Sequence, residues 1–169
     1  AVRVVVTGIG GFVGKAAGVA FARAGHDVVG VFRRSNPKEL EGVPGIALVQ
    51  ADLRDCSELP PRFDCLVHCA ADVPATCPSA AELYASNVDG TRTLFNHVAG
   101  AGARGVVFLS SMSAYGRIRD SVVTETTPID SPDVYGQSKL AGEQCLAGMV
   151  ERHPHMTALV LRLPAVVGK

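Results

Sequence analysis

The stretch VRVVVTGIGGFVG (residues 2–14) joins a run of β-branched residues to three glycines, Gly8, Gly11 and Gly14. A continuous apolar run of this kind is typical of a strand buried on both faces of a parallel sheet. Glycines at this spacing let the backbone turn tightly and approach a pyrophosphate, which free N–H groups at a helix N-terminus then bind. The stretch therefore predicts a dinucleotide site at the end of the first strand, and glycines that serve packing alone are the alternative.

Strand-like and helix-like segments alternate along the rest of the chain. The expected strands are 2–8, 27–32, 46–52, 63–71, 104–111 and 157–163, and the expected helices are 12–24, 80–101 and 135–151. Strands that alternate with helices form a parallel sheet with helices on both faces. We therefore predict an α/β fold, a doubly wound parallel sheet in a three-layer αβα Rossmann fold, as one domain over residues 1–169. Ligands bind such sheets beyond the carboxyl ends of the strands.

Composition excludes several classes of partner. Lys plus Arg and Asp plus Glu number sixteen each, so no charge excess favours nucleic acid or an anionic membrane. No apolar run approaches the roughly 20 residues of a membrane span, and the opening residues are strand-like rather than a signal peptide. Five cysteines without C-x-x-C spacing, and five scattered histidines, indicate a reducing cytoplasm and no metal site.

The end of the second predicted strand bears on the choice of dinucleotide. Sites that prefer NAD usually carry an Asp or Glu there, which accepts a hydrogen bond from the ribose 2′-hydroxyl. This chain has Phe32 at that position, followed by Arg33 and Arg34. A guanidinium suits a 2′-phosphate, so the sequence favours NADP over NAD. The alternative is that both arginines are solvated loop residues.

The segment DVYGQSK (133–139) places Tyr135 and Lys139 four positions apart, on one face of a predicted helix. A nearby positive charge lowers a tyrosine pKa from its usual value of about 10 toward neutrality, which would suit proton transfer. An exposed surface pair is the alternative.

Six segments together resemble the extended short-chain dehydrogenase/reductases of the NAD-dependent epimerase/dehydratase group, over nearly the whole chain. They are TGIGGFVG (7–14), ADLRD (51–55), HCAA (68–71), NVDGT (87–91), LSSMSAYG (109–116) and YGQSK (135–139). With Arg33 included, the cofactor contacts that follow are Gly8, Gly11, Phe12, Val13, Gly14, Arg33, Asp52, Leu53, Ala70, Ala71, Asn87, Tyr135 and Lys139.

The resemblance also implies roles for individual side chains. Tyr135 would be the acid/base at a carbinol or keto carbon, and Ser111 would hydrogen-bond the substrate oxygen. Lys139 would lower the tyrosine pKa and hold the nicotinamide ribose. Asp52 would reach the adenine amino group, and Asn87 would support the active-site helix.

The reaction expected from the resemblance is epimerisation of a nucleotide sugar. Family dehydratases carry Thr-Asp-Glu near the position of Ser111, whereas this chain has Ser111-Met112-Ser113, so dehydration is disfavoured. Ala165 and Val167, in LRLPAVVG (161–168), replace an Asn and a Tyr of nucleotide-sugar epimerases. The alternatives are an NADP-dependent 4-keto sugar reductase, a reductase of a lipophilic ketone, and a non-catalytic dinucleotide sensor.

Two expectations concern what surrounds this domain. Relatives of this type continue into a substrate-binding lobe, so the resemblance implies that the C-terminal lobe is missing from residues 1–169. The predicted helices 80–101 and 135–151 correspond to those through which such enzymes form homodimers.

Overall fold

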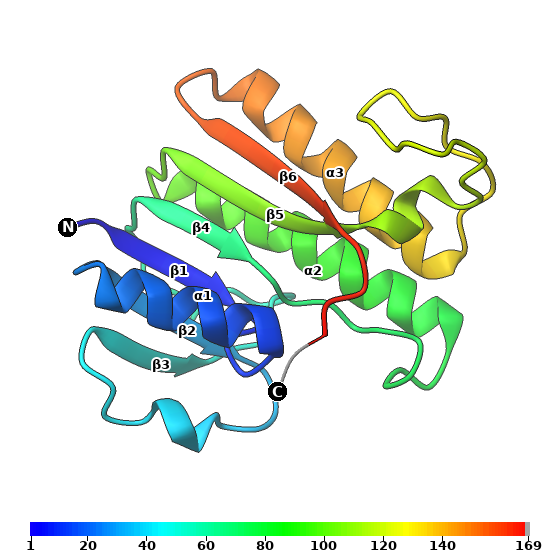
Figure 1. Cartoon of the computed structure of the whole chain (residues 1–169). Helices are drawn as coiled ribbons and strands as arrows, with labels where there is room; N and C mark the ends of the chain where they lie inside the picture. The colour runs from blue at the N-terminus through cyan, green and yellow to red at the C-terminus, as the bar shows by residue number, and fades with distance from the viewer. Residues whose placement is uncertain (168–169) are drawn as a thin grey trace.

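The computed structural model describes residues 1–167 (Figure 1). Gly168, the last residue of the segment compared with nucleotide-sugar epimerases, lies outside the described residues. The strands are β1 (Arg3–Thr7), β2 (Asp27–Phe32), β3 (Ile46–Gln50), β4 (Cys65–His68), β5 (Gly105–Ser111) and β6 (Thr157–Leu163). The helices are α1 (Phe12–Arg23), α2 (Ala80–Gly100) and α3 (Val134–Arg152), and the 3₁₀ helices are η1 (Lys38–Leu40) and η2 (Met112–Tyr115).

The six strands form one parallel sheet in the order β3-β2-β1-β4-β5-β6. The chain starts in the middle of the sheet, builds outward to β3, and then crosses back to β4 on the other side of β1. The strand order therefore reverses between β1 and β4, and ligands bind such sheets at this point. The predicted doubly wound fold is confirmed.

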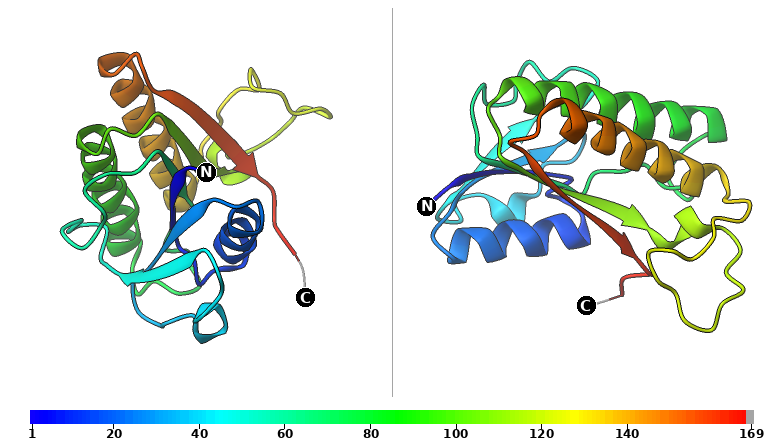
Figure 2. Two further views of the ribbon diagram at one scale, coloured as in Figure 1. Left: turned by 90° about the vertical axis from the view of Figure 1, so that its left-hand side faces the viewer. Right: turned by 90° about the horizontal axis from the view of Figure 1, so that it is seen from above.

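Helices cover the two faces of the sheet unequally: α1 lies on one face, and α2 and α3 lie side by side on the other (Figure 2). Alternate residues of β1 supply the two cores, because successive side chains of a strand point to opposite faces. Val5 packs in the cluster with α2 and α3, whereas Val4 and Val6 pack in the cluster on the α1 face. On the α1 face no helix among residues 1–167 covers β6, and Leu159 of that strand is 52% exposed.

Polar residues fix where two of the helices begin. The Ser79 side chain accepts a hydrogen bond from the Glu82 N–H (3.1 Å) ahead of α2, and the Asp133 side chain accepts one from the Gly136 N–H (2.7 Å) ahead of α3. Such caps satisfy N–H groups that have no partner within the helix. No helix among the described residues is long and apolar enough to cross a membrane.

The predicted boundaries were least accurate for the third and fourth strands. β4 covers 65–68 rather than 63–71, because it pairs with only the four residues 4–7 of β1. β3 stops at Gln50 rather than residue 52, and the chain turns at once, with the Asp55 N–H bonded to the Asp52 carbonyl (2.8 Å). The two 3₁₀ helices were not predicted, since such short elements leave little sequence periodicity.

Candidate functional site

The turn after β1 has the geometry that its glycines predicted. Gly8 has a φ of +67°, which favours glycine, and a Cβ there would lie 2.8 Å from the Ala70 nitrogen. A Cβ on Gly14 would collide with the Gly8 carbonyl oxygen. Gly11 precedes α1 without a side-chain cap, and no acidic residue lies in the first helical turn. The turn therefore leaves the N-terminus of α1 suited to an anion such as a pyrophosphate.

A cavity of about 270 Å³ lies beyond the carboxyl ends of β1, β2, β3 and β4, against α2. It brings together eight of the predicted cofactor residues: Gly8, Gly11, Arg33, Asp52, Leu53, Ala70, Ala71 and Asn87. Other residues of its lining include Phe32, His68, Cys69, Asp72 and Ser86. The glycine turn, the cavity and its charged rim together fit a dinucleotide.

The remaining predicted residues do not line this cavity. Phe12 is half exposed on α1, Val13 is partly buried, and Gly14 is buried beneath the turn, where its lack of a side chain permits close packing. Ser111 ends β5, while Tyr135 and Lys139 lie on the first turns of α3. These three catalytic candidates therefore flank the cavity on the β5 side.

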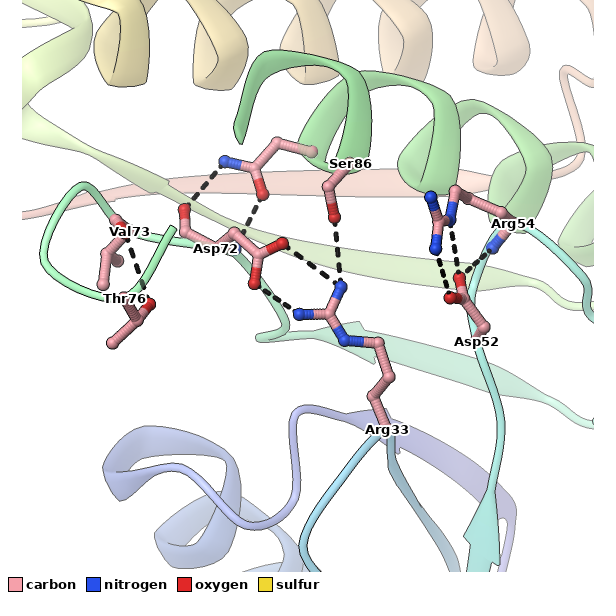
Figure 3. A network of polar contacts seen from close by, with 8 residues as sticks. Arg33, Asp52, Arg54, Asp72, Val73, Thr76 and Ser86 are labelled. Atoms are coloured by element: carbon pink, nitrogen blue, oxygen red, sulfur yellow. Dashed lines mark hydrogen bonds and ion pairs between the residues drawn. The ribbon is translucent and has the colours of Figure 1, made fainter. Parts of the chain in front are cut away.

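Arg33 reaches across the rim of the cavity to the loop after β4 (Figure 3). Its guanidinium donates to both carboxylate oxygens of Asp72, with Nη2–Oδ1 at 2.5 Å and Nη1–Oδ2 at 3.2 Å, and Nη1 also donates to the Ser86 hydroxyl at 3.2 Å. Burial alone would raise the pKa of Asp72, but the hydrogen bonds from Arg33 and Ser86 hold it below its usual range. The alternative that Arg33 is merely a solvated loop residue is wrong; Arg34 is exposed.

Asp52 is likewise held by an arginine of this chain. The Arg54 side chain donates to it through Nη2 (2.7 Å) and Nε (3.1 Å), and the Arg54 backbone N–H adds a third bond at 2.9 Å. The hydrogen bonds from Arg54 lower the pKa of Asp52 to about 2. The carboxylate is therefore charged and oriented at the cavity rim, while its predicted contact with adenine remains a prediction.

Asn87 links the cavity to the catalytic helix. Its Oδ1 accepts from the Asp72 N–H (2.7 Å), and its Nδ2 donates to the Asp72 carbonyl (2.9 Å) and to the Ser138 hydroxyl (3.1 Å). Ser138 in turn donates to the Tyr135 carbonyl (2.7 Å). One buried amide therefore links the loop after β4 to the start of α3.

Lys139 and Tyr135 are not a surface pair. Lys139 is 4% exposed, and its ammonium lies 4.4 Å from the centre of the Phe108 ring, a cation–π arrangement. Burial lowers the pKa of Lys139 to about 8. Burial and Asp133 raise the pKa of Tyr135, and the nearby Ser111 side chain partly offsets them. The structure thus brings Ser111 to Tyr135 but does not show the expected lowering of the tyrosine pKa by Lys139.

Sequence reasoning missed the aromatic and polar surroundings of Lys139. His68 is fully buried and stacks on Phe108 (5.4 Å between ring centres), with Thr7 Oγ1 at 2.7 Å from one ring nitrogen and Thr91 Oγ1 at 2.9 Å from the other. Burial lowers the pKa of His68 to about 3, so the imidazole is neutral. Its place in HCAA was the only signal, and that motif does not reveal the stacking partner.

A second cluster of side chains, whose contacts were not predicted from the sequence, holds α3 against β5 and β6. Arg162 on β6 forms a two-point ion pair with Glu143 on α3 (2.6 and 2.9 Å) and lies over the Tyr115 ring at 4.4 Å. Ser110 donates to the same carboxylate at 2.5 Å. The cluster ties β5, β6 and η2 to α3 one residue before Ser111 at the end of β5, so it has a structural role. Among the described residues, no cluster of His, Cys, Asp or Glu is arranged to hold a metal ion.

Comparison with known proteins adds to this geometry. Residues 4–169 match the NAD dependent epimerase/dehydratase family. The chain is 30% identical over 160 residues to a UDP-glucose 4-epimerase of Streptomyces lividans, which is 89% of this chain and 48% of that protein. It is 30% identical over 176 residues to a decarboxylating sterol-4-alpha-carboxylate 3-dehydrogenase of Dictyostelium discoideum, which is 98% of this chain and 54% of that protein.

A solved structure gives a similar result. UDP-glucose 4-epimerase from Bifidobacterium longum, in complex with NAD⁺ and UDP, superposes with a TM-score of 0.83 at 27% identity, over 95% of this chain and 52% of that one. The chain therefore spans about half the length of the relatives that it matches.

Proposed function

This chain belongs to the NAD-dependent epimerase/dehydratase family, and we propose that it binds NAD(P) and acts at a carbinol or keto carbon of a nucleotide-activated sugar, as part of a sugar epimerase. The observation that carries the proposal is the buried Lys139, one helical turn from Tyr135 on α3, with Ser111 close enough to that tyrosine to lower its pKa. A dinucleotide sensor has no chemical need to bury a lysine beside this pair.

A bound nicotinamide dinucleotide supplies the acceptance and return of a hydride. Tyr135 exchanges the hydroxyl proton of the substrate carbon, as general acid and base. Ser111 hydrogen-bonds the substrate oxygen and orients it toward Tyr135. Lys139, which is mostly protonated at pH 7, places a positive charge beside a tyrosine that burial would otherwise keep neutral.

The preference for NADP over NAD is a finer part of the proposal. It rests on Arg33 at the cavity rim and on the absence of an acidic residue at Phe32. The Bifidobacterium longum relative was solved with NAD⁺, so the relatives support a nicotinamide dinucleotide without deciding which one.

A reductase of a lipophilic ketone is the second candidate. Ala165 and Val167 replace polar residues of the nucleotide-sugar epimerases, and Val167 is 88% exposed after β6. The Dictyostelium relative is named for a sterol substrate, and its sequence identity to this chain equals that of the Streptomyces epimerase.

We also propose a cytoplasmic homodimer that pairs through α2 and α3. Tyr84, which is 38% exposed on α2, supplies apolar surface there.

The test is turnover of UDP-glucose by the full-length protein, with Tyr135→Phe as the matched variant. Interconversion of the sugar that is abolished in the variant, with NAD(P) affinity within a few fold, is the expected result. A wild type that reduces a sterol-like ketone but no nucleotide sugar would favour the second candidate. Binding of dinucleotide without either reaction would favour a sensor.

A further inference from the structure

We propose that Asp72 sets the choice between NAD and NADP, by competing with the 2′-phosphate of NADP for the guanidinium of Arg33. The inference rests on the proposed binding of a nicotinamide dinucleotide and adds to it a residue that determines specificity. Asp72 was not among the residues predicted from the sequence. It directly follows HCAA (68–71) and lies 39 positions from Arg33.

The first step is that the binding groups of Arg33 are already engaged. Both terminal nitrogens bond to Asp72, and one of them also bonds to Ser86 (Figure 3). A guanidinium recognises a carboxylate and a phosphate through the same planar fork. A phosphate that approaches the Arg33 guanidinium therefore finds its two terminal nitrogens already bonded to the negatively charged Asp72 carboxylate.

The second step is that Asp72 cannot easily move away. Its backbone N–H and carbonyl are both bonded to the Asn87 side chain, at 2.7 and 2.9 Å, and Asn87 is itself buried. The Asp72 side chain is only 13% exposed, so little solvent screens its charge. Even if Arg33 turned toward a 2′-phosphate, the carboxylate would remain at the rim and repel it.

The third step is that other charges at the rim do not remove this conflict. Arg54 is already paired with Asp52, so neither side chain replaces Arg33 as a partner for a phosphate. Arg34 is exposed and not among the lining residues, so it is a weaker partner for a phosphate. The uncharged 2′-hydroxyl of NAD meets no repulsion from Asp72. Asp72 therefore weakens the preference for NADP that Arg33 would otherwise give.

The experiment is a double-mutant cycle on the full-length protein, with affinities for NAD⁺ and NADP⁺ measured by calorimetry. Adenosine 2′,5′-bisphosphate and AMP serve as a second pair of probes that lack the nicotinamide half. We expect Asp72→Asn to tighten NADP⁺ and bisphosphate binding about tenfold, with NAD⁺ and AMP changed less than threefold. The gain should disappear in Arg33→Ala/Asp72→Asn, because the competition is for Arg33.

Asp27→Asn is the matched control. Asp27 pairs with Arg3 at 2.7 Å at the other end of β2, so this variant removes the same charge and the same kind of pair away from the cavity. It should leave both affinities unchanged. If Asp72→Asn does not fold, as judged by its thermal transition, Asp72→Ser removes the same carboxylate.

Three results would overturn the proposal: equal changes for NAD⁺ and NADP⁺, no change for either, or a gain that persists without Arg33. These results can be told apart from a failure of the proposed sugar chemistry. That failure would be seen as absent turnover of UDP-glucose, whereas the affinities for NAD⁺ and NADP⁺ test only the role of Asp72. A full-length protein that binds neither dinucleotide would overturn the inference together with the cofactor part of the proposed function.

Discussion

The two flanks of the cavity differ in how their charged side chains are paired. On the β2–β3 side, Arg33 pairs with Asp72 and Arg54 pairs with Asp52. The pKa values of both carboxyl groups are lowered, so both remain charged at neutral pH. On the β5 side, no carboxylate of the described residues lies within ion-pair distance of Lys139, whose pKa falls to about 8 while that of Tyr135 rises. The first flank suits binding of fixed charges, and the second suits proton transfer near neutrality.

The sharpest test of this contrast is removal of the proton donor. Tyr135→Phe should lower turnover about 10²–10⁴-fold, the range for a positioned acid/base, because nothing else on the β5 side exchanges the substrate proton. Steady-state rates measure the loss, and calorimetry should give dinucleotide affinity within a few fold of wild type. Equal activity of the variant would show that the β5 flank is not the catalytic one.

A second prediction concerns the stability cost of the buried lysine. Burial lowers the pKa of Lys139 from its usual 10.5 to about 8, which corresponds to about 3 kcal/mol of destabilisation below pH 8. The sign follows because between pH 8 and 10.5 the unfolded chain binds more protons than the folded one, so stability rises with pH. Lys139→Met should therefore unfold at higher urea concentration at pH 7 and lose this advantage near pH 10.5.

Glu151→Gln, on the exposed end of α3, is the matched control and should show no such pH-dependent difference from wild type. A Lys139→Met variant that is less stable than wild type at pH 7 would mean that the contacts of the ammonium outweigh the cost of burying its charge.

The aromatic ring beneath the lysine allows a smaller perturbation of the same flank. Phe108→Leu removes the ring that faces the Lys139 ammonium and His68. We expect a loss of about 1–2 kcal/mol in the free energy of unfolding, from lost packing and the lost cation–π contact. The pKa of Lys139 should also fall further, because the ring favours the charged form. Urea unfolding and ¹⁵N NMR titration of the lysine measure the two effects; an unchanged lysine pKa would leave only packing.

The contrast between the flanks also marks what sequence could predict. The glycine turn and the Tyr135–Lys139 pair are local patterns, readable because strand, turn and helix impose fixed spacings. The Arg33–Asp72 pair joins residues 39 positions apart, and only the packed sheet brings them together. Phe108 was readable as a buried strand residue, but its contact with Lys139 depends on how α3 packs on β5. Local chemistry was therefore predicted, and its partners were not.

The smallest expected effect belongs to the exposed ion pair. The side chains of Asp52 and Arg54 are 36% and 59% exposed, so solvent screens their attraction, and such pairs contribute about 0–1 kcal/mol. Arg54→Ala should change the free energy of unfolding within that range, although the lowered pKa of Asp52 taken alone would suggest a larger effect. Asp72→Asn, in the same assay, breaks a pair that is far less exposed and should cost more, because it leaves Arg33 without its carboxylate. Equal losses in the two variants would show that burial does not separate the two pairs, and the β2–β3 flank would then be a uniformly solvated surface.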